Sequence, residues 1–339
     1  MIEPHFLGLS RRSLLLLGTA AAPALIGSRA HANTSLPDKA LRILVGSTAG
    51  GGSELMARAI VVRLEARTGR HIAIENKANG TGLAAGEYLK KGLADGTVVA
   101  FLPSTMLVAA LAGEQFPFDT QSDVVPLTAA GALQVELAVA PSTGVSSFAD
   151  WVAWVKAGPA ERARLGLTST DAYLRVYAMM IGREIGVTLE AVQHKGAAPL
   201  AAALKSGAVP AGIGSVATLH QHDRGGAMKV LMTSGHKRLS IAPAVPTALE
   251  LGHPALELDE WYGGFASSAS PAPVAEEWSR QLRGVFEEPE VAAELARFGL
   301  DVETSSQEEA TQRFAAHLQT WKERLESFGL KTGDTKKGP

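Results

Sequence analysis

The chain has 339 residues, of which 46% are hydrophobic, with 35 glycines and 17 prolines. This composition is typical of a globular protein long enough to form two lobes, each with its own core. The formal net charge of −2 without a long basic run gives no indication of nucleic-acid binding, and the absence of cysteine excludes disulfides, thiol nucleophiles and thiolate metal sites.

The first 32 residues have the pattern of an export signal. Arg11 and Arg12 form a twin-arginine pair, an apolar run follows at 14–26, and Ala30-His31-Ala32 matches an A-x-A cleavage site. The apolar run is too short to cross a bilayer comfortably. We therefore expect cleavage after Ala32 and a periplasmic mature protein. The arginine pair favours twin-arginine (Tat) export, with the general secretory route as the alternative.

A strand, a glycine-rich turn and a helix follow one another near the start of the mature chain. Residues 41–46 are short and apolar, as in a buried strand, and residues 55–67 place apolar side chains on one helical face. Between them, Gly50, Gly51 and Gly52 free the backbone to adopt positive φ. Unpaired N–H groups and the positive end of the helix dipole then favour an anion or a carbonyl oxygen. A tight turn without a ligand is the equally weighted alternative.

Strands and helices alternate along the rest of the chain. Further strands are expected at 71–75, 97–102, 134–140, 164–167, 189–193, 211–215 and 229–234, with an extended segment at 257–265. Helices are expected at 83–93, 148–156, 172–185, 200–206, 245–251, 275–286, 290–297 and 308–328, the last capped by Ser305 or Ser306. Repeated βα units predict mainly parallel sheets with helices on both faces, and ligands outside the carboxyl ends of the strands.

Several of these strand ends carry polar groups. Ser104 and Thr105 follow one strand, and the hydroxyl-rich turn 168–171 precedes the helix at 172–185. One such group suffices as a helix N-cap, so capping alone and capping plus ligand contact both stay open. A glycine-rich strand ends at Ser215, where a ligand or another backbone approaches closely. Lys195 is the one candidate cation in these loops, with a solvated surface lysine as its alternative.

The order of motifs resembles the periplasmic substrate-binding proteins of tripartite tricarboxylate transporters, the Bug-type receptors. The matching motifs are Gly50-Gly51-Gly52-Ser53, Glu75-Asn76-Lys77, Asn79-Gly80-Thr81-Gly82, Ala94-Asp95-Gly96-Thr97, Lys195-Gly196-Ala197-Ala198-Pro199, Thr233-Ser234-Gly235-His236-Lys237-Arg238, Val245-Pro246-Thr247-Ala248 and Trp261-Tyr262-Gly263. They cover about residues 38 to 330. In this sequence Glu54 stands where the family often has an aspartate, and Tyr173 lies near the usual place of a histidine.

The resemblance implies a two-lobed, hinged α/β binding protein of the Venus-flytrap type. It closes around a small organic acid or amino-acid-like solute and delivers it to the permease subunits of a membrane transporter. It implies a monomer that is not an enzyme and has no cofactor or metal. We expect the first lobe at 33–139 and 250–330, the second at 140–249, and a disordered tail at 331–339.

We expect the solute to contact groups of the strand-end loops together with the Trp261 stretch. The expected residues are Ala49, Gly50, Gly51, Gly52, Ser53, Glu54, Ser104, Thr105, Thr168, Ser169, Thr170, Lys195, Gly196, Ser215 and Trp261. Glu54 also fits a first-turn helix acid favoured by the helix dipole, and that alternative stays open.

Other functions remain to be weighed. Residues 80–86 read G-x-G-x-x-x-G, similar to a dinucleotide fingerprint, which keeps an exported nucleotide-dependent oxidoreductase as an alternative. The next strand has no acid at its end for a ribose, so close helix–strand packing is favoured. His220, His222 and Asp223 are compatible with a metal cluster, although a solvated polar loop is favoured. A degenerate receptor used for signalling is also open. No G-x-S-x-G nucleophile elbow occurs.

Overall fold

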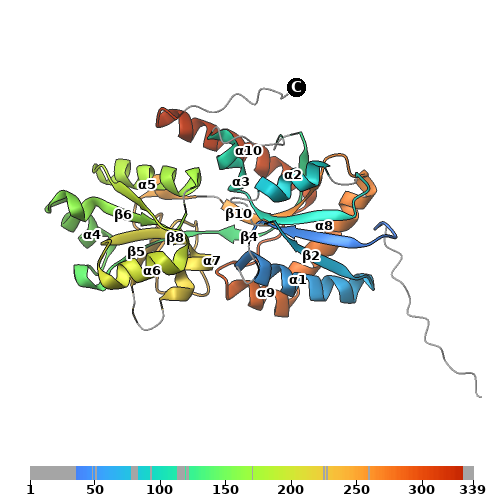
Figure 1. Cartoon of the computed structure of the whole chain (residues 1–339), viewed down its shortest axis with the longest axis horizontal. Coiled ribbons are helices and arrows are strands. Elements are labelled where there is room, and N and C mark those ends of the chain that lie inside the picture. Colours follow the sequence, from blue (N-terminus) through green and yellow to red (C-terminus); the bar gives the residue numbers. More distant parts are fainter. Residues whose placement is uncertain are drawn as a thin grey trace, which may run out of the picture. The chain divides into compact units, whose positions relative to one another are not determined.

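The computed structural model describes residues 36–47, 49, 52–77, 83–91, 94–112, 119, 122–169, 171–223, 226, 228–258 and 260–330. The expected signal peptide with its cleavage site and the tail at 331–339 lie outside these residues. Within them, no helix combines the length and apolar character needed to cross a membrane. Two five-stranded sheets, each with helices on both faces, organise the described chain (Figure 1). The expected two-sheet α/β fold is confirmed.

The first sheet has the strand order β2-β1-β3-β10-β4. Its strands are β1 (Leu41–Val45), β2 (Ile72–Asn76), β3 (Val98–Pro103), β4 (Val124–Leu133) and β10 (Glu260–Ser267). Strand β1 pairs in parallel with β2 and β3, whereas β10 pairs antiparallel with β3 and β4. The sheet is therefore mixed, because β10 enters it from the opposite direction after a long excursion of the chain.

Both faces of the first sheet are covered by helices. The helices are α1 (Gly52–Thr68), α8 (Ala272–Phe286) and α9 (Pro289–Ala296) on one face, and α2 (Leu83–Lys91), α3 (Met106–Leu111) and α10 (Gln307–Ser327) on the other. Trp278 of α8 is fully buried in the first of these two cores, and Phe314 of α10 packs on Trp261 and Phe265 in the second. Burial of these large rings supplies much of the hydrophobic stabilisation of the sheet.

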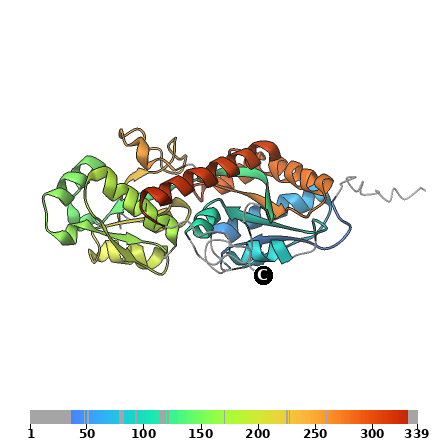
Figure 2. The ribbon, with the colours of Figure 1, turned by 90° about the horizontal axis from the view of Figure 1, so that it is seen from above.

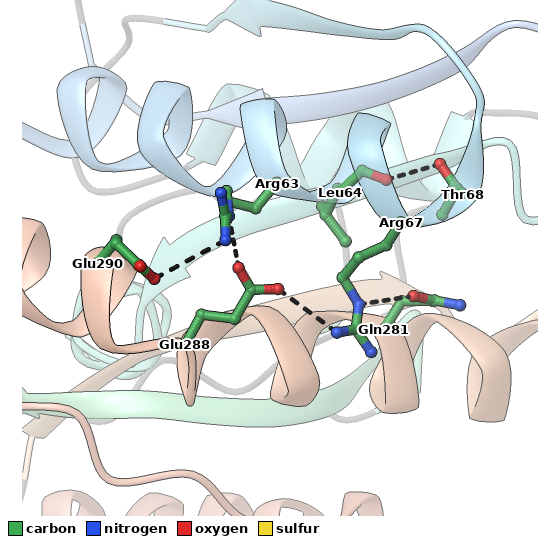
Figure 3. Close-up of polar contacts among 7 residues, drawn as sticks. All are labelled: Arg63, Leu64, Arg67, Thr68, Gln281, Glu288 and Glu290. Carbon is green, nitrogen blue, oxygen red and sulfur yellow. Dashed lines mark hydrogen bonds and ion pairs between the residues drawn. The ribbon is translucent and has the colours of Figure 1, made fainter.

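A polar seam fastens α1 to the segment that joins α8 and α9 (Figure 3). Arg63 and Arg67 of α1 share the carboxylate of Glu288, and the Arg67 Nη1 to Glu288 Oε1 distance is 3.4 Å. Arg67 also donates to Gln281 Oε1 at 3.3 Å, and Arg63 lies 3.7 Å from Glu290. The seam fixes the orientation of α1, whose N-terminus lies at the glycine-rich loop.

The second sheet has the order β7-β6-β8-β5-β9. Its strands are β5 (Val135–Val139), β6 (Arg164–Leu167), β7 (Glu190–Gln193), β8 (Ala211–Ser215) and β9 (Lys229–Thr233). Its covering helices are α4 (Phe148–Lys156) and α5 (Ala172–Ile185) on one face, and α6 (Ala197–Ser206) and α7 (Val216–Leu219) on the other. Strand β6 pairs in parallel with β7 and β8, while β5 pairs antiparallel with β8 and β9.

Two connections and one helix join the two sheets. The chain passes from β4 to β5 with only Gln134 between them, and it returns between Leu258 and Glu260. Strand β5 belongs to the second sheet, so the sheet boundary falls at Gln134 and not after residue 139 as expected. No turn residue marks this change of sheet, since β4 and β5 form an almost continuous strand.

The long helix α10 makes contacts with elements of both sheets (Figure 2). Its N-terminal half packs on β4, and Trp321 in its C-terminal half lies against Tyr173 of α5 with ring centroids 5.5 Å apart. Near its end, Ser327 accepts hydrogen bonds from Arg183 of α5 at its Oγ and its carbonyl oxygen, at 3.1 and 2.7 Å. Helix α10 is thus a third structural link between the two sheets.

Most expected elements are present within a few residues, and Ser306 caps α10 in a capping box with Glu309. The helix expected at 245–251 is wrong. Thr247 instead forms an isolated parallel bridge with Thr233, whose N–H donates to the carbonyl of Pro246 at 3.0 Å. Proline at this position suits an extended segment followed by a turn better than a helix interior. Strand β4 and helix α3 were not expected from the sequence.

Candidate ligand-binding site

The glycine-rich loop of the first sheet lies beside the end of β8 in the second sheet. A Cβ atom placed on Gly52 would be 3.4 Å from the carbonyl oxygen of Ala217. Ala217 comes two residues after Ser215, the last residue of β8. Gly52 is also the first residue of α1, a 17-residue helix whose N-terminus therefore lies at this point. Two loops predicted to hold the ligand are thus brought together, one from each sheet.

Three hydroxyl groups of the strand ends and of the start of α5 are buried and have no hydrogen-bond partner among the described residues. They are Ser47 Oγ after β1, Ser215 Oγ at the end of β8, and Tyr173 Oη in the first turn of α5. Leaving a buried hydroxyl unpaired costs roughly 1–3 kcal/mol, so such groups normally bind water or a ligand. By contrast, Ser53 is already paired, because its Oγ lies 2.9 Å from the hydroxyl of Tyr262.

The two predicted charged contacts differ in exposure. Glu54 is 1% exposed and pairs with Arg58 one turn later on α1, which is the geometry of a first-turn helix acid. Lys195 is exposed, and it precedes Gly196, whose φ of +112° favours glycine. The N–H of Gly196 donates to the carbonyl of Thr168 at 2.9 Å. This bond holds the loops after β6 and β7 against each other.

The turn before α5 uses most of its polar groups internally. Asp171 is the N-cap, and its Oδ1 accepts from the N–H of Leu174 at 3.1 Å. Ser169 donates to the other oxygen of Asp171 at 2.6 Å. Asp171 therefore caps α5 and Ser169 bonds to it, whereas Thr168 is half-buried; Thr170, the remaining residue of this turn, lies outside the described residues.

The structure gives Ser104 and Trp261 interior positions. Ser104 is fully buried, donates through Oγ to Glu260 Oε2 at 2.6 Å, and accepts from the N–H of Trp261 at 3.1 Å. The Trp261 ring is also fully buried and stacks on Phe265 at 5.4 Å. Neighbouring Thr105 is 6% exposed. Ser104 and Trp261 therefore support the β3 end of the site from within, and neither offers an open surface.

The remaining predicted residues are placed only in part. Ala49 is exposed, whereas Gly50, Gly51 and Thr170 lie outside the described residues. The glycines of the dinucleotide-like pattern at 80–82 also lie outside them.

Sequence reasoning missed a buried carboxylate between the two sheets. Glu260 is fully buried, its Oε1 accepts from Trp321 Nε1 at 2.7 Å, and its Oε2 lies 3.0 Å from His317 Nε2. Burial alone would raise the pKa of Glu260, but the charge of His317 and the hydrogen bonds from His317, Ser104 and Trp321 lower it overall. Glu260 therefore stays ionised. No sequence signal identifies these partners, which come from two segments distant from Glu260, the end of β3 and helix α10.

The His220 region has a different explanation from the metal cluster considered above. His220 Nδ1 lies 3.0 Å from Oε2 of Glu136, a fully buried residue of β5. Burial raises the pKa of Glu136 to about 7, and the hydrogen bond to Glu136 is the main cause of a raised pKa at His220. Among the described residues, no group of three or more potential ligands could hold a metal ion.

Comparisons with known proteins agree with this architecture. Residues 56–330 match the family model described as the tripartite tricarboxylate transporter family receptor. The chain is 24% identical to the protein BugT of Bordetella pertussis over 322 residues, covering 94% of this chain and 98% of BugT.

Two solved structures share the fold. The periplasmic binding protein BugD has a TM-score of 0.75 and 19% identity, covering 88% of this chain and 100% of BugD. An R. palustris protein with adipate also has a TM-score of 0.75, with 22% identity and coverage of 87% of this chain and 99% of that protein.

The family match at 56–330 spans the second sheet and all of the first sheet except β1, and it identifies a receptor, so the expectation of a binding protein in place of an enzyme is confirmed. The exported oxidoreductase is thereby set aside. The chain belongs to the tripartite tricarboxylate transporter receptor family.

Proposed function

We propose that this protein is an extracytoplasmic receptor for a small carboxylated solute, which it delivers to the permease subunits of a tripartite tricarboxylate-type transporter. The leader at 1–32 directs export, and the mature protein acts in the periplasm as a monomer. The observation that carries the proposal is the receptor-family match over residues 56–330. The adipate bound by one structural neighbour and the periplasmic location of BugD support the solute class and the compartment.

The site chemistry fits an oxygen-rich anion. The unpartnered hydroxyls of Ser47, Ser215 and Tyr173 are hydrogen-bond donors, and the N-terminus of α1 at Gly52 adds backbone N–H groups and a positive dipole end. Micromolar affinity corresponds to about −8 kcal/mol. Hydrogen bonds to a charged group contribute roughly 1.5–3 kcal/mol each, so three or four of them suffice when closure excludes water.

A thermal-shift screen of residues 33–339 tests the proposal. The panel contains adipate, shorter dicarboxylates, tricarboxylates, amino acids, aromatic acids and the dinucleotides NAD and NADP. Binding to the folded state raises the melting temperature by mass action, so a carboxylate at a hundredfold excess over its Kd adds about 2.7 kcal/mol of stability. A shift with a carboxylate alone supports the receptor. A shift with dinucleotides alone, or with nothing, contradicts it, and the second result favours the signalling role.

A glycine substitution locates the site. Gly52→Val adds a branched side chain whose Cβ already lies 3.4 Å from the carbonyl oxygen of Ala217, so its methyl groups crowd the space where the two loops meet. We expect the Kd for the solute found in the screen to rise at least tenfold, while the melting temperature without solute changes by only a few degrees. Ala272→Val is the matched control, because it places valine at the exposed first position of α8. Unchanged affinity in Gly52→Val would place the site elsewhere.

A further inference from the structure

One continuous set of contacts runs from the β3 end of the first sheet to the first turn of α5 in the second. It begins at Ser104, whose Oγ donates to Glu260 Oε2 at 2.6 Å. It continues through Glu260 Oε1, which accepts from Trp321 Nε1 of α10 at 2.7 Å. It ends where the Trp321 ring meets Tyr173, with centroids 5.5 Å apart. All four side chains are at least 94% buried.

One end of this path lies at the Ser104 loop, which the sequence predicts to contact the solute, and the other end lies at Tyr173, whose hydroxyl the proposed function assigns to the solute. Ser104 closes β3, and its own N–H donates to the carbonyl of Trp261 at 2.8 Å, so its position is fixed from both sides. Tyr173 lies in the first turn of α5, two residues after the N-cap Asp171, and its hydroxyl is unpartnered among the described residues. A shift of Trp321 would therefore act on Tyr173 in the second half of the protein and, through Glu260, on the interior support of the β3 end in the first half.

The centre of the path lies where the chain returns from the second sheet to the first. Glu260 is the first residue of β10, and Leu258 just before it donates its N–H to the carbonyl of Ser234 in the second half. Arg324 of α10 donates to the carbonyl of Glu257 at 3.2 Å, which holds the helix on this return segment. This return segment is one of the two places where the chain passes between the sheets, the other being Gln134.

We propose that Glu260 is a positioning residue that couples the Ser104 loop of the first sheet to the first turn of α5 through Trp321. The Glu260 carboxylate contacts Ser104 and His317 through Oε2 and accepts from Trp321 through Oε1. It therefore joins the end of β3, which carries Ser104, to helix α10, which carries His317 and Trp321. A change in the position of either loop on solute binding is then transmitted to the other loop through Glu260 and Trp321. The inference rests on the proposed function only for the identity of what the loops bind.

Hydrogen exchange measured by mass spectrometry on the solute-free mature protein tests the coupling. Trp321→Phe keeps an aromatic ring at this position and removes the N–H donor to Glu260, together with part of the volume of the buried indole. We expect exchange to accelerate at least threefold in both residues 104–112 and residues 171–178. The matched control is Trp278→Phe, since Trp278 is equally buried and loses one hydrogen bond of similar length, 2.8 Å to the carbonyl of Gly96. That variant should leave both segments at the wild-type rate.

Ser104→Ala provides an independent variant that removes the opposite end of the path. It should accelerate exchange in residues 171–178, although the substituted residue belongs to the first sheet. Acceleration of only one segment in Trp321→Phe, equal acceleration of both in Trp278→Phe, or a wild-type rate at 171–178 in Ser104→Ala overturns the proposal.

A titration with adipate separates this test from that of the proposed function. If wild-type protein binds adipate, Trp321→Phe should raise its Kd about fivefold while Trp278→Phe leaves it unchanged; an unchanged Kd in Trp321→Phe overturns the coupling. If wild-type protein binds no solute of the panel, the receptor proposal fails by itself. The exchange rates still decide the coupling, because they need no ligand.

Discussion

Glu136→Gln should stabilise the protein at alkaline pH and leave its stability unchanged in acid. Glu136 is fully buried in the second sheet, and His220 is its one hydrogen-bond partner among the described residues. Its second carboxylate oxygen, Oε1, is buried without a partner there. Burial is the main cause that raises the pKa of Glu136 from 4.5 to about 7, with a further contribution from the charge of Asp223.

The sign follows from linkage. Because the pKa of Glu136 is higher in the folded than in the unfolded protein, the folded state holds the proton more tightly. The stabilisation of the folded state by the protonated Glu136 is therefore fully present below pH 4.5 and is lost as the pH rises through about 7. The raised pKa of His220 acts in the same direction at the upper end of this range. Wild-type stability should thus decline between pH 5 and pH 8.

The magnitude follows from the same pKa values. Each pKa unit corresponds to about 1.4 kcal/mol, so ionisation of Glu136 costs roughly 3 kcal/mol at high pH. Glutamine keeps the shape without the charge, and we subtract about 1 kcal/mol for a weaker hydrogen bond to His220. The expected gain at pH 8 is about 2 kcal/mol, or about 4 °C in Tm for a protein of this size. At pH 5 the two proteins should agree within about 0.5 kcal/mol.

Urea denaturation of the mature protein and of Glu136→Gln at pH 5, 6, 7 and 8 measures this difference. His220→Gln is the informative counterpart, because it removes the group that lowers the pKa of Glu136 and should steepen the decline with pH. If Glu136→Gln is no more stable than wild type at pH 8, the buried carboxylate is not a source of destabilisation and the argument fails.

Three further substitutions test individual elements. Ser306→Ala removes the capping box of α10 and should cost about 1 kcal/mol in urea denaturation; no loss would mean that the cap is redundant. Gly131→Ala should cost about 3 kcal/mol or more, because the added Cβ would lie 2.3 Å from the carbonyl oxygen of Asp301, and wild-type stability would show that β4 moves freely there. Asp95→Asn should lower Tm at pH 7 but not at pH 2. Hydrogen bonding to Lys39 is the main cause that lowers the pKa of Asp95 from 3.8 to about 2. The stabilisation from the Asp95 carboxylate is therefore present above pH 3.8 and is lost as the pH falls through 2. An equal loss of Tm at both pH values would exclude this electrostatic origin.

The parts of the fold that local sequence determines were predictable. Strand β6, strand β8 and helix α5 have the bounds that their apolar patterns and flanking turn residues indicate. Strand β4 shows the limit of this reasoning. It contains Pro126 and Gly131 and many small residues, and its pairing with β10 is interrupted by two register shifts. Its strand character comes from a partner more than 120 residues away, which no local pattern encodes.

The sequence predicted which strand-end loops lie near each other, but not the hydrogen-bond partners of their side chains. Strand ends in a βα succession are where ligands are expected, and Gly52 does lie close to Ala217, two residues after the end of β8. Ser104 follows the same rule by position, yet its hydroxyl is taken by Glu260, 156 residues later. A serine at a strand end has the same sequence context whether it faces a solute or an interior carboxylate.

The two buried Glu–His pairs explain why composition alone cannot assign such groups. Glu136 and Glu260 are both fully buried and both lie about 3.0 Å from a histidine nitrogen, but their pKa values move in opposite directions. Burial favours the neutral acid in both cases. Glu260 has Ser104 and Trp321 as additional donors, one on each oxygen, whereas Glu136 has one unpartnered oxygen within the described chain.

The number of hydrogen-bond donors on each carboxylate therefore decides whether its ionised form destabilises the protein or holds neighbouring segments together. A carboxylate held on both oxygens remains ionised inside the protein and fixes the segments that hold it, as required of Glu260 where the chain returns between the sheets. A carboxylate held on one oxygen takes up a proton near neutral pH. Removing the charge should consequently have opposite effects on stability at pH 8. Glu136→Gln stabilises the protein. Glu260→Gln destabilises it, because Ser104, His317 and Trp321 lose an ionised acceptor.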